Sequence, residues 1–125
     1  MTRPTTRAAR GARNHAAGSM AEDSVAAHYT RLGGRILARR WRCEWGEIDL
    51  IVGLGDTVIF IEVKSARSHE QAAWRLGPAQ MHRITTAATA YCGQLEAGLR
   101  TPMRFDLALV DGVGRVSVIE NAFGA

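Results

Sequence analysis

Three charged residues stand at positions where a folded chain usually places apolar side chains. Asp49 interrupts one apolar stretch, and Glu62 and Lys64 stand at the end of another, at residues 58–64. Buried carboxylates are costly unless they are paired or bound to a metal. Two carboxylates held close together suit a hard divalent cation such as Mg²⁺ or Mn²⁺, and the main-chain carbonyl of Val63 would add a further oxygen ligand.

A lysine beside two metal-binding carboxylates makes hydrolysis of a phosphodiester the natural reaction. The metal would polarise the scissile phosphate and lower the pKa of a bound water. Lys64 would orient that water or neutralise the charge that develops on the phosphorane, and it would act as a general base only with a lowered pKa. It is the only lysine among sixteen basic residues, and arginine cannot act as a base.

Two neighbouring strands are expected to bring these residues together. Residues 46–52 and 57–64 are rich in β-branched and other apolar residues, and a glycine-rich turn separates them. If the two strands pair as a hairpin, Asp49 falls near Glu62. Since side chains alternate between the faces of a strand, Glu62 and Lys64 share one face.

The rest of the chain predicts an α/β fold. The order of elements indicates a mixed β-sheet flanked by helices. The first expected element is a helix from Ser19 to Gly33, in which Ser19 is a candidate N-cap with Glu22 at capping-box spacing. It is followed by strands at 35–43, 46–52 and 57–64, a polar loop at 65–77, a helix from Pro78 to Gly98, and strands at 104–110 and 115–119.

The composition is that of one globular domain. The 125 residues are 46% hydrophobic and 22% charged, which excludes a wholly disordered chain, a collagen and a coiled coil. No stretch approaches the roughly 20 apolar residues of a membrane helix. Cys43 and Cys92 favour a reducing cytoplasm over a disulfide framework. Residues 1–18 are arginine-rich and lack acidic residues, so we expect a disordered basic arm before a folded domain at 19–125.

The net charge of +4 favours a polyanionic partner, most simply nucleic acid, and no motif for a small-molecule cofactor is present. Exposed tryptophans can stack on unpaired bases, although in small domains they are more often core residues. Trp41 and Trp45 are stacking candidates, and Trp74 is the strongest because it lies in a polar loop. The expected nucleic-acid contacts are Arg40, Arg42, Arg67, Trp74, Arg75 and Gln80.

The two apolar stretches also carry a family resemblance. Residues 46–51 (GEIDLI), followed after a turn by residues 60–64 (FIEVK), resemble the YraN-type proteins, small bacterial proteins placed in the PD-(D/E)XK nuclease superfamily. The likeness extends from about Glu22 to Asp106. It implies a restriction-endonuclease-like α-β-β-β-α-β core, related to that of Holliday-junction resolvases, and hence a nuclease-like domain at residues 19–125.

The resemblance also implies roles for individual residues. Asp49 and Glu62 would bind the metal, and Lys64 would be the catalytic lysine. Glu22 corresponds to an acidic residue that in related nucleases can reach the metal site. Gln80 stands near a position where the family often has a lysine, which puts a second cationic phosphate contact in doubt.

The resulting prediction is a cytoplasmic, Mg²⁺- or Mn²⁺-dependent endonuclease that acts on nucleic acid, with DNA favoured. The alternatives are a non-catalytic nucleic-acid-binding module and a DNA-repair scaffold on the same fold, and a homodimer stays open. Glu62 and Lys64 would otherwise form a surface ion pair, the capping box would explain Glu22, and Glu47 is either a further metal ligand or a solvated strand residue.

Overall fold

A computed structural model of the chain describes residues 7–73 and 76–124, with side chains from residue 18 onward. The elements are α1 (Arg7–Arg31), β1 (Arg35–Cys43), β2 (Gly46–Leu54), β3 (Thr57–Ser65), α2 (His69–Ala73), α3 (Pro78–Cys92), the 3₁₀ helix η1 (Gly98–Arg100), β4 (Met103–Val110) and β5 (Val116–Ile119).

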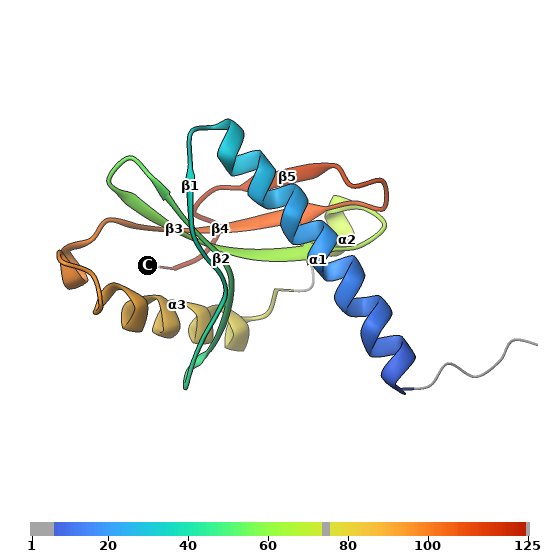
Figure 1. Cartoon of the computed structure of the whole chain (residues 1–125), viewed down its shortest axis with the longest axis horizontal. Coiled ribbons are helices and arrows are strands. Elements are labelled where there is room, and N and C mark those ends of the chain that lie inside the picture. Colours follow the sequence, from blue (N-terminus) through green and yellow to red (C-terminus); the bar gives the residue numbers. More distant parts are fainter. Residues whose placement is uncertain (1–6, 74–75, 125) are drawn as a thin grey trace, which may run out of the picture.

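The five strands form one mixed sheet in the order β1-β2-β3-β4-β5 (Figure 1). Consecutive strands pair antiparallel, except that β3 and β4 run parallel because α3 crosses between them. The predicted α/β fold, a mixed sheet with flanking helices in α-β-β-β-α-β order, is therefore confirmed, with α2 and β5 added to that core.

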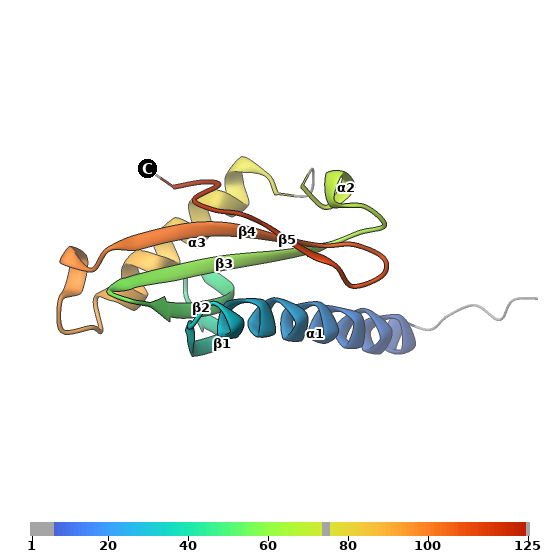
Figure 2. The same ribbon diagram turned by 90° about the horizontal axis from the view of Figure 1, so that it is seen from above.

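The two long helices cover opposite faces of the sheet (Figure 2). On one face the α1 side chains Ala21, Val25 and Tyr29 recur at i, i+4 spacing and pack on alternate residues of β2, β3 and β4. On the other face Ile84 and Ala88 of α3 pack on side chains of β2, β3 and β4 that include Phe60 and Phe105. Because both faces are covered, β3 is a central strand with an almost continuous run of buried residues.

Helix α1 is longer than the sequence predicts. It begins at Arg7, so Ser19 lies inside the helix and does not cap it, and the expected boundary between residues 18 and 19 is not a linker. Residues 1–6 of the predicted disordered arm lie outside the described residues. The helix ends as expected, since Gly33 has a φ of +92° and the N–H of Gly34 donates to the carbonyl of Tyr29 at 2.8 Å.

Two further elements differ from the predicted ones. The segment expected to be a polar loop contains the short helix α2, whose Ala72 is buried against Leu107 and Leu109 of β4. Helix α3 ends at Cys92 rather than near Gly98, because turns and η1 follow it. Over the described residues, no helix is both long and apolar enough to cross a membrane.

Candidate functional site

Asp49 lies where the β2–β3 ladder ends. The backbone pairing of these strands ends at Leu50 opposite Ile61. Beyond that pair, the N–H of Val63 donates to Oδ2 of Asp49 at 2.8 Å. The carboxylate thus accepts a bond that the backbone of β2 would otherwise receive, which fixes its orientation against β3.

Glu62 and Lys64 lie on the face of β3 that α3 covers, as the alternation of side chains predicts. Nζ of Lys64 lies 3.2 Å from Oε1 of Glu62. Gln80, in the first turns of α3, donates from Nε2 to the same oxygen at 2.8 Å. The side chain of Glu62 is only 6% exposed and that of Lys64 only 18%, so the two residues are not a solvated surface pair.

The two carboxylates interact directly. Burial, followed by the negative charge of Asp49, raises the pKa of Glu62 from 4.5 to about 8, although Lys64 opposes the shift. Burial also raises the pKa of Asp49, and the N–H of Val63 opposes that shift. Near neutral pH the pair therefore tends to hold a shared proton, as two crowded carboxylates do when no cation balances them.

The carbonyl of Val63 faces the same side as Asp49. The N–H of Val58 in β3 donates to the carbonyl of Pro102, just before β4, and the N–H of Ala66, just after β3, donates to the carbonyl of Val110 at the end of β4. Backbone polar groups alternate in direction along a strand, and the N–H and C=O of one residue point to the same side. Odd-numbered residues of β3 thus face β2, so the carbonyl of Val63 is directed toward Asp49.

A cavity of about 240 Å³ opens beside Asp49 on the α1 side of the sheet. Its lining includes the carboxylates of Glu22, Glu47 and Asp49, together with Arg40 and Val63. Three carboxylates and one guanidinium give the cavity a net negative charge, which attracts a cation. Glu47, which is 37% exposed, therefore lines the same cavity as Asp49, and its negative charge helps to raise the pKa of Asp49.

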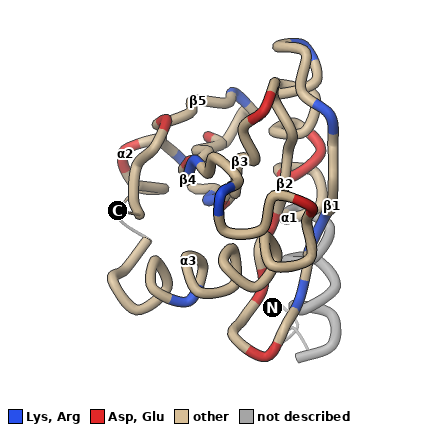
Figure 3. Tube along the Cα trace, turned by 90° about the vertical axis from the view of Figure 1, so that its left-hand side faces the viewer, with Lys and Arg blue, Asp and Glu red and all other residues tan. Residues whose placement is uncertain are grey.

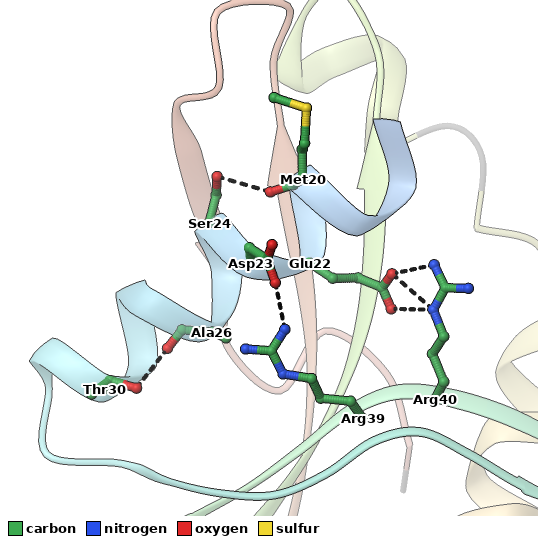
Figure 4. Close-up of polar contacts among 8 residues, drawn as sticks. All are labelled: Met20, Glu22, Asp23, Ser24, Ala26, Thr30, Arg39 and Arg40. Carbon is green, nitrogen blue, oxygen red and sulfur yellow. Dashed lines mark hydrogen bonds and ion pairs between the residues drawn. The ribbon is translucent and has the colours of Figure 1, made fainter. Parts of the chain in front are cut away.

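Glu22 is held by Arg40 rather than standing alone (Figure 4). Nη2 of Arg40 lies 2.7 Å from Oε2 of Glu22, and Nε lies 3.1 and 3.2 Å from the two carboxylate oxygens. Arg40 has a φ of +49°, which is uncommon for a residue with a long side chain. The backbone of β1 is therefore irregular at the residue that binds Glu22.

This donor set fits a magnesium-type cation. Among the described residues, no three His, Cys, Asp or Glu side chains converge into a ready-made metal cluster. Mg²⁺, however, is usually held by one or two carboxylates and keeps water and substrate phosphate as its other ligands. Asp49, Glu62 and the carbonyl of Val63 supply such a set, with Glu22 and Glu47 nearby.

The structure places the predicted nucleic-acid contacts in different surroundings. Arg42 is exposed and lies 3.6 Å from Glu47, whereas Arg67 is exposed beside Gly112, away from the carboxylates. Gln80 binds Glu62, so its contact is with the carboxylate pair. Trp74 and Arg75 lie outside the described residues.

One buried carboxylate, that of Asp106 on β4, was not singled out by the sequence analysis. It is fully buried and accepts hydrogen bonds from Tyr29 Oη at 2.7 Å, from two nitrogens of Arg104 at 2.9 Å and from the N–H of Asn121 at 2.9 Å. These hydrogen bonds stabilise the buried negative charge of Asp106. The residue therefore connects α1, β4 and the C-terminal segment and is not part of the cavity beside Asp49. The sequence feature that could have indicated this buried residue is an aspartate between Phe105 and Leu107 in an apolar strand.

Comparisons with known proteins agree with the sequence resemblance. The model of the uncharacterised protein family UPF0102 matches residues 21–110. A UPF0102 protein of Ruegeria pomeroyi is 52% identical over 117 residues, which cover 94% of this chain and 95% of the relative. A UPF0102 protein of Cereibacter sphaeroides is 53% identical over 109 residues, which cover 87% of this chain and 93% of the relative. A UPF0102 protein of Dinoroseobacter shibae is 43% identical over 115 residues, which cover 92% of this chain and 86% of the relative.

Proposed function

This chain belongs to the UPF0102 family, the YraN-like proteins, and we propose that it is a metal-dependent endonuclease that hydrolyses phosphodiester bonds of nucleic acid, preferably DNA, in the cytoplasm. The observation that carries the proposal is the direct interaction of Asp49 with Glu62, with Lys64, the only lysine of the chain, bound to Glu62. Burying two like charges side by side is unfavourable, and a divalent cation compensates for it.

The residues of the site have separate tasks in such a reaction. A divalent cation, when bound, supplies positive charge that polarises the scissile phosphate and makes a water molecule more acidic. Asp49 and Glu62 would hold the cation, with the carbonyl of Val63 as a third protein ligand. Gln80 restrains the Glu62 carboxylate through its hydrogen bond, so the side chain would lose less conformational freedom when the cation binds.

Lys64 would act next to the attacked phosphate. Its ammonium group already lies 3.2 Å from Glu62, so it would be close to any phosphate oxygen that approaches the cation. From there it would orient the attacking water or balance the negative charge that grows in the transition state. Arginine at this position would keep the positive charge but could not exchange a proton.

The test is a cleavage assay on duplex, single-stranded, flapped and four-way DNA and on RNA, with Mg²⁺, with Mn²⁺ and with EDTA. The variants are Glu62→Gln and Lys64→Ala. Glu120→Gln is the matched control, because Glu120 carries an exposed carboxylate at the end of β5, away from the pair. We expect metal-dependent cleavage by the wild type and the control, and a loss of at least about a hundredfold in both site variants.

Three results would contradict the proposal. Cleavage that persists in EDTA or in Glu62→Gln would point to a contaminating nuclease or to another site. Binding to nucleic acid without any metal-dependent cleavage would favour a non-catalytic binding module. Neither binding nor cleavage would favour a scaffold role on this fold.

A further inference from the structure

The β1–β2 hairpin ends in an exposed tryptophan. Cys43 pairs with Gly46, so Glu44 and Trp45 form a two-residue turn at the tip. The tip projects beyond α3 in two views related by a quarter turn (Figures 1 and 3). Trp45 is 50% exposed, which leaves a large aromatic surface in water at a projecting end of the molecule.

The exposure of Trp45 is particular to this residue. Trp41, on the same hairpin, packs edge-on against Tyr91 with ring centroids 5.3 Å apart and belongs to the core beneath α3. Trp41 thus accounts for the packing of the hairpin on α3. Trp45, by contrast, keeps half of its surface exposed, and that half is accessible to a ligand.

Two arginines flank this tip. Arg42 precedes the turn with a side chain that is 74% exposed. Arg83, on α3, is exposed, and its Cβ lies 3.7 Å from the position that a Cβ on Gly46 would occupy. An aromatic ring next to arginines is the usual surface for single-stranded nucleic acid, because the ring stacks on a base and the guanidinium groups bind phosphates.

Acidic side chains are also present at the tip. Glu44 is exposed within the turn, and Glu47 lies 3.6 Å from Arg42. They reduce the net positive charge of this surface, so stacking on Trp45, rather than charge, must supply most of the binding there.

The tip is connected to the carboxylate pair along two elements. Trp45 and Asp49 are four residues apart on or next to β2, which corresponds to about 13 Å along a strand. Gln80 and Arg83 are three residues apart on α3, and residues at this spacing share a helix face. Since Gln80 binds Glu62 and Arg83 lies beside Gly46, one face of α3 leads from the site to the tip.

We propose that the hairpin tip binds an unpaired nucleobase by stacking on Trp45, with Arg42 and Arg83 on the adjoining phosphates. The inference rests on the proposed nuclease function and specifies its substrate class. A span of about 13 Å corresponds to about four nucleotides of a stacked strand at 3.4 Å each. The preferred substrate therefore carries an unpaired or terminal base within a few nucleotides of the bond that is cut.

The test measures binding in EDTA, where a metal-dependent enzyme does not cut. Fluorescence anisotropy is recorded for a labelled single strand, a flapped duplex and a covalently closed duplex that has no ends. Trp45→Ala should weaken binding of the first two by about tenfold or more, and Trp45→Phe should retain most of the affinity. Arg83→Gln should weaken binding less, and Glu44→Gln should strengthen it.

Each outcome decides the proposal. Unchanged affinity of Trp45→Ala for the single strand and the flap overturns it, as does an equal loss on the closed duplex or an absence of nucleic-acid binding by the wild type. If Trp45 binds another protein instead of nucleic acid, its replacement will leave nucleic-acid binding unchanged, which is the first of these results. Cleavage that needs Glu62 but not Trp45 would leave the nuclease standing without this inference, whereas Trp45-dependent binding without cleavage would leave the inference standing without the nuclease.

Discussion

Replacing Glu62 with glutamine should remove a pH-dependent destabilisation of the fold while it abolishes the candidate metal site. Glutamine keeps the size of the side chain and an oxygen that can accept from Gln80 and Lys64. It removes the ionisable group whose pKa rises from 4.5 to about 8 on folding. A gain in stability from the loss of a reactive residue is typical of sites that store unfavourable electrostatics.

The size of the effect follows from proton linkage. The unfolded chain releases the Glu62 proton near pH 4.5, whereas the folded chain keeps it up to about pH 8. The stability that this proton contributes is thus complete below pH 4.5 and is lost as the pH rises to about 8, at about 1.4 kcal/mol per pH unit. Between pH of about 5 and about 7, the difference in unfolding free energy between Glu62→Gln and the wild type should grow by about 3 kcal/mol in favour of the variant.

The assay is urea denaturation of both proteins at the two pH values, without metal and then with Mg²⁺. Glu47→Gln is the matched control, because the same change is made beside Asp49 on a side chain that is 37% exposed. Added Mg²⁺ should stabilise the wild type and the control, but not Glu62→Gln. A stability difference that stays constant with pH within about 1 kcal/mol would refute the reasoning, since Glu62 would then titrate alike in the folded and unfolded chains.

Two further predictions concern the fold. Asp106→Asn should lower the free energy of unfolding by about 3 kcal/mol in denaturant titrations, because the donors around this buried charge would face a neutral group; a loss no larger than that of the exposed Glu120→Gln would contradict this account. Gly34→Ala should cost about 2 kcal/mol and lower Tm, because the new Cβ would lie 2.7 Å from Cγ1 of Val52. Gly77→Ala meets no atom within 4 Å and should change Tm little, so equal shifts for the two glycines would exclude the steric explanation.

The carboxylate pair and its lysine were predictable because they depend on local rules. The period-two alternation of β3 puts Glu62 and Lys64 on one face, and the short turn to β2 sets the register that brings Asp49 close. Both rules act within one hairpin. The same is true of the end of α1 at Gly33, where a left-handed conformation is available at little cost only to glycine.

The predictions failed where an interaction joins distant parts of the chain. A capping box was one of two interpretations of Glu22, and it is wrong because α1 begins twelve residues before Ser19; Glu22 binds Arg40. Arg40 also has a positive φ, which no propensity of arginine indicates. The start of α1 was equally hidden, because residues 7–18 contain too few large apolar side chains to show a helical period.

The confinement of Asp49, Glu62 and Lys64 to a single hairpin has a consequence for how the protein forms and changes. A hairpin closes within about 10 μs, long before the parallel pairing of β3 with β4 can be completed across the intervening chain. The two carboxylates and the lysine are thus local to one small unit, whereas the cavity beside Asp49 is also lined by residues of α1 and β1. Substitutions on α1 can therefore reshape the cavity while the carboxylates and the lysine stay in register.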